Sequence, residues 1–67
     1  MLELIVNGQP RRFGRPLTAL ELLAELSLDP RAVVVELNRQ IVRRPDLGQT
    51  RLDDGDAVEL VHFVGGG

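Results

Sequence analysis

Three glycines close the sequence, and they carry its most distinctive chemistry: Gly65, Gly66 and Gly67. Residues without a Cβ atom form a thin, pliable strip that can enter a narrow tunnel in a partner. We expect Gly67 to end the chain and to offer its α-carboxylate as the reactive group. A carboxylate is a poor electrophile, so it must first be activated, most simply as an acyl-adenylate, before a nucleophile can attack it.

The other candidate groups are few and scattered. The sequence has no cysteine and no tyrosine, and His62 is its single histidine. A lone histidine with no nucleophile or orienting carboxylate beside it is a weak catalytic candidate. Its spacing from Val58 and Leu60 places it at the rim of the core side of a strand. We therefore expect no catalytic residue, and we expect that this chain is not an enzyme.

Three aspartates, Asp53, Asp54 and Asp56, resemble a fragment of a calcium loop. They lack the alternating acidic spacing and the closing glutamate of an EF-hand, and Asp-Gly sets a tight turn by itself. One histidine without cysteine also cannot complete a structural zinc site. We expect a turn here, and no metal or cofactor bound by the chain.

The composition fits one small soluble domain. With 67 residues and 43% hydrophobic content, the chain can build one core and no more. A net charge of −2 argues against a nucleic-acid partner. No apolar run approaches the ~20 residues that span a bilayer, so no membrane is expected. The first residues lack the basic and long apolar regions of a signal peptide, which favours the cytoplasm.

A hairpin is the first element expected to position the glycine run. Residues 2–6 alternate in the manner of a strand. Asn7-Gly8 favours a tight turn, because both residues tolerate positive φ. Residues 9–13 then return as a second strand, and Pro10 places that strand at a sheet edge.

A helix follows. Thr18 and Glu21 form a capping box, in which each side chain can satisfy a backbone N–H at a helix start. Pro30 stops any continuation. We expect one short helix, and its apolar stripe is predicted to consist of Leu20, Leu23, Ala24 and Leu26.

The second half of the chain reads as three strands. Residues 32–37 are the clearest, with a β-branched run in which alternate residues share a face. A turn at 38–39 leads to a brief strand over 40–42, and residues 43–49 are predicted to be a loop. Residues 57–63 form the last strand and lead directly towards the glycines.

This order of elements predicts an α+β fold. A helix that crosses between the opening hairpin and a later strand implies a mixed sheet of four to five strands with the one main helix on one face. That arrangement is the ubiquitin-like β-grasp. We expect the β-grasp domain to occupy residues 1–64 and a flexible glycine tail to occupy residues 65–67.

The first and last strands are neighbours in a β-grasp sheet, so their outward residues share a face. Ile5, Val61 and Phe63 then form an exposed apolar patch beside the tail. Such a patch on a small protein usually marks a partner surface. We predict that these three residues, together with Gly65 and Gly66, bind partners.

Three stretches resemble the bacterial sulfur carriers of thiamine biosynthesis, the ThiS family. They are Val35-Glu36-Leu37-Asn38-Arg39-Gln40-Ile41-Val42, Leu52-Asp53-Asp54-Gly55-Asp56-Ala57-Val58-Glu59-Leu60, and Phe63-Val64-Gly65-Gly66-Gly67. The hairpin and the helix fit the same family, so the likeness covers nearly the whole chain. A terminal glycine pair alone is shared by several sulfur carriers and ubiquitin-like proteins.

The resemblance implies a sequence of partners. An E1-like adenylating enzyme of the ThiF type would use ATP and magnesium to adenylate Gly67. Sulfur from a cysteine desulfurase, delivered as persulfide, would give a Gly67 thiocarboxylate. A thiazole synthase of the ThiG type would accept that sulfur, and the carrier would return to its carboxylate form. ATP and magnesium belong to the adenylating enzyme, and the carrier catalyses nothing.

Two alternatives remain open at the level of sequence. One is a carrier of the same fold that serves molybdopterin synthesis or transfer-RNA thiolation. The other is a β-grasp interaction module whose glycine end is inert. The first would differ in its acceptor enzyme, and the second would tolerate a tag at its C-terminus.

Overall fold

The computed structural model describes residues 1–63 of the chain, and Val64 to Gly67 lie outside the described residues. The strands are β1 (Leu2–Val6), β2 (Gln9–Phe13), β3 (Val33–Leu37), β4 (Gln40–Val42) and β5 (Ala57–His62). The helices are α1 (Ala19–Glu25) and two 3₁₀ helices, η1 (Pro30–Ala32) and η2 (Arg44–Gln49). The strands form one sheet in the order β2-β1-β5-β3-β4.

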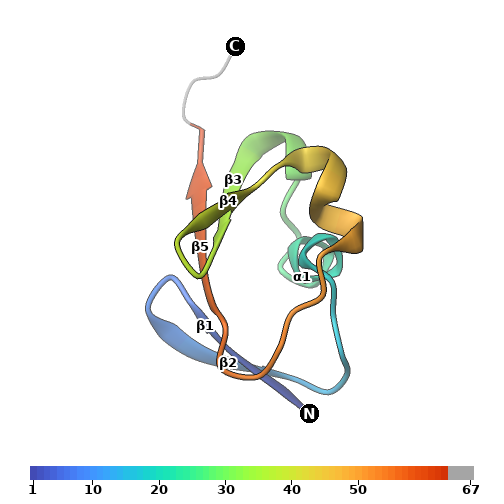
Figure 1. The fold of residues 1–67 in the computed structure, drawn as a ribbon, viewed down its shortest axis with the longest axis vertical. Coiled ribbons are helices and arrows are strands. Elements are labelled where there is room, and N and C mark those ends of the chain that lie inside the picture. Colours follow the sequence, from blue (N-terminus) through green and yellow to red (C-terminus); the bar gives the residue numbers. More distant parts are fainter. Residues whose placement is uncertain (64–67) are drawn as a thin grey trace.

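The sheet is mixed, as predicted. β1 and β5 run parallel, and the other neighbouring strands are antiparallel. Figure 1 shows α1 and η2 on one side of the sheet, with β5 between β1 and β3. The helix-containing connection from β2 to β3 leaves the central position free for β5. This topology confirms the predicted α+β class and the edge position of β2.

Positive φ angles occur at the turns that the sequence predicted. Asn7 and Gly8 have φ values of 49° and 81°, and Asn38 and Arg39 have 51° and 72°. Two successive positive φ angles match the right-handed twist of the flanking strands, which is why such turns close hairpins. Gly55 has φ 86° in the turn before β5.

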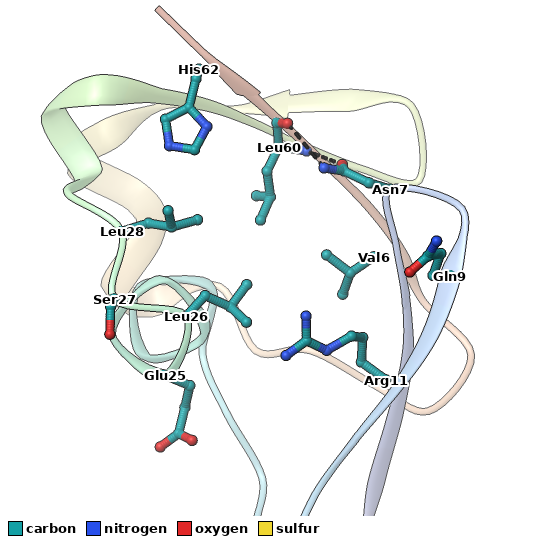
Figure 2. Close-up of a pocket in the computed structure, with 10 residues that line it drawn as sticks. All are labelled: Val6, Asn7, Gln9, Arg11, Glu25, Leu26, Ser27, Leu28, Leu60 and His62. Carbon is teal, nitrogen blue, oxygen red and sulfur yellow. Dashed lines mark hydrogen bonds between the residues drawn. The ribbon is translucent and has the colours of Figure 1, made fainter.

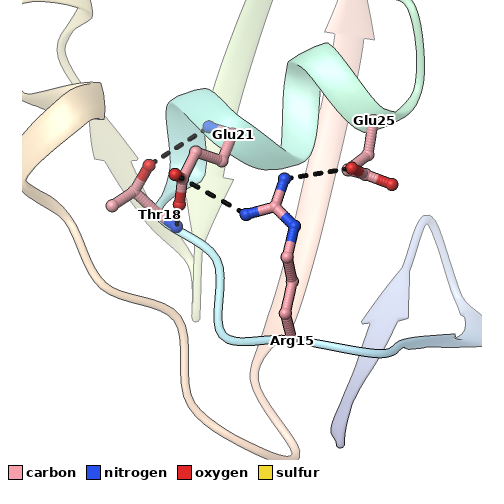
Figure 3. A network of polar contacts seen from close by, with 4 residues as sticks. All are labelled: Arg15, Thr18, Glu21 and Glu25. Atoms are coloured by element: carbon pink, nitrogen blue, oxygen red, sulfur yellow. Dashed lines mark hydrogen bonds and ion pairs between the residues drawn. The ribbon is translucent and has the colours of Figure 1, made fainter.

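The predicted capping box starts α1. Thr18 Oγ1 accepts from the N–H of Glu21 over 3.1 Å, and the Thr18 N–H donates to Glu21 Oε1 over 2.8 Å. That backbone hydrogen bond is the main cause that lowers the pKa of Glu21. Arg15 lies between Glu21 and Glu25, at 3.7 Å and 3.1 Å, and ties the helix to the preceding loop (Figure 3).

The buried stripe of α1 differs from the prediction. The helix buries Ala19, Leu22 and Leu23. Leu26 packs against the core from the helix end, but Leu20 and Ala24 are exposed. Both stripes have helical spacing, so periodicity alone could not separate them. The angle at which the helix lies on the sheet decides between them.

The prediction of a loop over residues 43–49 is also wrong. Arg44–Gln49 is a 3₁₀ helix, and it inserts Leu47 into the core with 2% of its surface exposed. Leu20 lies close to this helix: a Cβ atom added at Gly48 would be 3.6 Å from Leu20 Cδ2. The Leu20 side of α1 therefore borders η2 and does not face the sheet as predicted.

The core lies between the sheet and these helices. Its buried members are Leu2, Leu4, Val6, Leu17, Ala19, Leu22, Leu23, Val33, Val35, Leu47, Leu52, Val58 and Leu60. Strand alternation supplies the sheet side of this set from β1, β3 and β5. Among residues 1–63, no helix is long and apolar enough to cross a membrane.

Candidate functional site

β5 leads towards the glycine run, and its end is held against β3. His62 lies opposite Val33 in the ladder, and the N–H of Phe63 donates to the carbonyl oxygen of Ala32 over 3.0 Å. The backbone is thus hydrogen-bonded as far as residue 63, the last that the structure describes. The predicted tail residues Gly65, Gly66 and Gly67 lie outside the described residues, so their roles stay predictions.

Asn7 fixes the course of β5 from the other side. Its backbone N–H donates to Val58 over 2.9 Å, and its side-chain Oδ1 accepts from the N–H of Leu60 over 2.7 Å. Its Nδ2 donates to the Leu60 carbonyl over 3.3 Å (Figure 2). The side chain therefore continues the β1–β5 ladder after β1 has turned away. Sequence reasoning recognised Asn7 only as a turn residue.

Exposed apolar side chains gather on the outer face of the sheet near the end of β5. Val61, Phe63 and Ile41 are 53%, 54% and 65% exposed. Val61 lies directly opposite Val34 of β3. Val34, Ile41 and Phe63 also line a hollow of about 150 Å³, which Arg43 and Arg44 line as well. We call Val34, Ile41, Val61 and Phe63 the outer patch.

Ile5 lies apart from this patch. It is half-buried and stands opposite Ala57, whereas Val61 is four residues further along β5. Four residues of strand span about 13 Å. Glu59 lies between the two positions on the same face. The structure thus brings Val61 and Phe63 together with Val34 and Ile41, and not with Ile5.

The sequence indicates the outward orientation of the two added members, but not their place in the patch. Alternation within the third strand already points Val34 away from the core, because Val33 and Val35 point inward. Ile41 follows from the hairpin, since it lies opposite Glu36. The missing information was that β3 is a neighbour of β5, which is a long-range pairing that no local pattern records.

His62 lies on the helix side of the sheet, as predicted, at the rim of an open groove of about 580 Å³. The apolar floor of this groove consists of Val6, Leu26, Leu28 and Leu60. Figure 2 shows the side chains of Ser27 and Glu25 pointing away from His62. Within the described residues, the groove therefore does not bring a nucleophile and a base together.

The acidic turn before β5 uses its carboxylates internally. Asp56 accepts from the N–H of Asp53 over 2.8 Å and from Asn38 Nδ2 over 3.1 Å. Asp54 accepts from the N–H of Glu3 over 2.8 Å, which ties the turn to β1. These bonds confirm the turn. Across residues 1–63, no group of three or more His, Cys, Asp or Glu side chains is arranged to hold a metal ion.

A family model described as the ThiS family matches residues 4–67, which includes the three glycines. The chain belongs to the ThiS family. It is 42% identical over 68 residues to the sulfur carrier protein ThiS of Bacillus subtilis, and the match covers 100% of both chains. It also superposes on the crystal structure of the thiamine biosynthesis protein ThiS from Geobacter metallireducens with a TM-score of 0.85. That pair is 40% identical, over 98% of this chain and 100% of the other, and the likeness confirms the ubiquitin-like fold.

A second kind of relative is much longer. The chain is 42% identical over 66 residues to a thiazole synthase of Paramagnetospirillum magneticum. The match covers 98% of this chain but only 20% of that protein. A thiazole synthase of Magnetococcus marinus shows the same proportions at 36% identity. The chain thus spans about a fifth of the length of these two relatives, which contain a segment similar to a ThiS domain.

Proposed function

We propose that this chain is a sulfur carrier for the thiazole part of thiamine and that its sulfur is held at the Gly67 carboxylate. The observation that carries the proposal is the match to the Bacillus subtilis carrier over the full length of both chains. Family membership through residue 67 supports the assignment of the glycine run as the working end. On this proposal the chain is a co-substrate of other enzymes and not a catalyst.

The chemistry follows from the carboxylate. An E1-like adenylating enzyme joins the Gly67 carboxylate to AMP from ATP and releases pyrophosphate. The terminal sulfur of a cysteine desulfurase persulfide then displaces AMP and forms an acyl persulfide with Gly67. A second thiol attacks the S–S bond of this intermediate, which releases the Gly67 thiocarboxylate and leaves a disulfide between the two thiols. Magnesium neutralises the ATP phosphates within the adenylating enzyme, so this chain needs no cofactor of its own. Glycine at positions 65–67 keeps the end narrow enough to enter that active site.

Thiazole synthase is the proposed acceptor. A segment similar to this chain is part of the Paramagnetospirillum magneticum polypeptide named thiazole synthase. Residence in one polypeptide raises the effective concentration of a donor near its acceptor. This arrangement supports the thiazole route over carriers that serve molybdopterin or transfer-RNA thiolation.

The outer patch is the proposed docking surface for the adenylating enzyme. Phe63 and Val61 lie on the last described residues before the glycine run, so a partner that covers them also meets the tail. The sheet edges are less suited to docking. Pro10 and two arginines interrupt β2, and β4 has only three residues. Both features discourage the addition of a further strand.

The test is an intact-mass measurement after incubation with the cognate adenylating enzyme, ATP and a sulfur donor. We expect a mass change that corresponds to one oxygen replaced by sulfur, located at Gly67 by fragmentation, and no change when ATP is omitted. Adding thiazole synthase and its small substrates should return the original mass. A modification at any other residue, or sulfur transfer only to a molybdopterin or transfer-RNA system, would contradict the proposal.

A further inference from the structure

Two glutamates stand opposite each other on the outer face of the sheet. Glu36 of β3 and Glu59 of β5 are direct partners in the antiparallel ladder. Side chains in such positions have Cβ atoms about 4.5–5.5 Å apart, and like charges there destabilise a sheet. Glu59 is exposed and Glu36 is half-buried. The folded chain therefore holds an unfavourable pair at the centre of its sheet.

Neither glutamate of this pair belongs to an ion pair in the described part of the chain. The ion pairs within residues 1–63 use other acidic residues, namely Glu3, Glu21, Glu25 and Asp29. Neither Glu36 nor Glu59 takes part in a side-chain hydrogen bond there. Eight arginines are available in the sequence, so the missing partner does not reflect a shortage of positive charge.

The acidic pair lies inside an apolar frame. Ile41 stands opposite Glu36 on its β4 side. The next outward row of the ladder is Val34 opposite Val61. A partner that covers the outer patch must therefore also cover Glu36 and Glu59 and remove water from them. Loss of water strengthens the repulsion between the two carboxylates unless a positive charge enters with the partner.

We propose that the outer patch binds a protein surface that places one arginine or lysine side chain between Glu36 and Glu59. The proposal rests on the carrier function above and specifies how its adenylating enzyme recognises this face. A guanidinium or ammonium group shared by two carboxylates makes charge-assisted hydrogen bonds, which are shorter and stronger than neutral ones. In the complex, the same contact removes the repulsion between the two glutamates that is present in the free carrier.

A second copy of this chain fits the face poorly. In a two-fold symmetric dimer the same patch meets itself. An axis between Glu36 and Glu59 would bring four carboxylates together. A partner of a different kind, which carries the complementary charge, is favoured by this distribution.

The experiment measures ATP–pyrophosphate exchange by the cognate adenylating enzyme as a function of carrier concentration. The variants are Glu36→Gln, Glu59→Gln and the double variant, each compared with Glu25→Gln. The control removes one negative charge from the helix side of the molecule, as many as each single variant removes from the outer face. We expect the KM for the carrier to rise roughly tenfold or more in the double variant, with kcat at saturation unchanged. The control should keep its KM within about twofold, because the charge and the Arg15 ion pair that it removes lie on the helix side, away from the outer patch.

The thermal melt supplies the second readout. Relief of the repulsion should raise the melting temperature of the Glu36→Gln and Glu59→Gln variants while their binding weakens. An unchanged KM in the double variant would overturn the proposal. So would a raised KM together with a lowered melting temperature, which would indicate a structural role. Failure of the carrier function would look different, because the wild-type chain would then support no exchange at any concentration.

Discussion

The two faces of the sheet are built from the same strands but differ in every other respect. On the helix side, β5 contributes Val58 and Leu60, which are 0% and 8% exposed. On the outer side, the intervening Glu59 and Val61 are exposed, and they lie opposite Glu36 and Val34. The buried residues on the helix side are all apolar. The outer side mixes apolar surface with an unneutralised charge pair.

The contrast indicates that alternate residues of each strand serve two roles, packing of the core and recognition of partners. A chain of 67 residues draws its stability from a single core, and a core of this size supplies only about 3–5 kcal/mol. Alternation lets that core use every second residue and leaves the others free for recognition. Substitutions on the two faces should therefore separate stability from partner binding.

The largest difference between the effect on partner activity and the effect on stability is expected at the tail. Gly66→Val should abolish adenylation, because a β-branched side chain restricts the backbone and widens the strip that must enter the activating site. The free energy of unfolding should change by no more than about 0.5 kcal/mol, as for surface positions away from packed features. The measurements are ATP–pyrophosphate exchange with the adenylating enzyme and a circular dichroism melt.

Deletion of Gly67 is the companion variant. It should also abolish exchange and leave the melt in place. Full exchange by Gly66→Val would refute the need for a thin tail, whereas a clear drop in melting temperature would mean that the tail packs as structure. An inert interaction module would tolerate both changes.

The helix side gives the opposite result. Leu22→Ala should cost about 2–5 kcal/mol, because a fully buried leucine leaves a cavity when it is truncated. Leu22 is 0% exposed and Leu20 on the same helix is 41% exposed, so Leu20→Ala is the matched control. We expect the control to keep most of its stability in urea denaturation. Equal losses in the two variants would contradict the observed orientation of α1.

The outer patch should show a smaller and more specific effect. Val61→Ser combined with Phe63→Ser should raise the KM for the carrier about tenfold, since interface side chains near the centre of a patch often contribute 1–2 kcal/mol or more. The melting temperature should fall little, because both side chains are about half exposed in the folded chain.

Ile5→Ser distinguishes the patch seen in the structure from the one predicted by sequence. Ile5 is half-buried and lies about 13 Å along the sheet from Val61. We expect this variant to lower the melting temperature more than it raises the KM. A large rise in KM with an unchanged melt would return Ile5 to the docking surface.

Local chemistry made the turns and the helix start predictable. Asn7-Gly8 and Thr18 with Glu21 each act through their own backbone, so their geometry needs no distant partner. The strands were also predictable, because alternation and β-branching are local properties. Family membership extended this reading to the glycine run, whose residues 65–67 lie outside the described structure.

Features that depend on long-range packing were not predictable. The buried face of α1 depends on the η2 helix, which packs Leu47 into the core and lies close to Leu20. The outer patch depends on the register between β3 and β5, and the acidic pair appears only when that register is known. Each miss concerns the relative placement of elements that were themselves correctly identified.

The smallest expected effect concerns the capping box, which lies on the helix side of the sheet and away from the outer patch. Thr18→Ala should cost about 1 kcal/mol at neutral pH, the usual loss when a capping side chain is removed.

Glu21→Gln is the partner variant, because it keeps an acceptor for the Thr18 N–H but removes the charge. The pKa of Glu21 is lowered in the folded chain, mainly by that backbone hydrogen bond. The folded state therefore gains stability from this carboxylate above the pKa of the unfolded chain, and it loses that gain as the pH falls through the folded-state pKa. Melts from neutral to acidic pH should show a smaller acid-induced loss in Glu21→Gln than in Thr18→Ala, which keeps the titrating group. Neither variant should change the KM for the adenylating enzyme, and a change would link the helix side of the molecule to recognition.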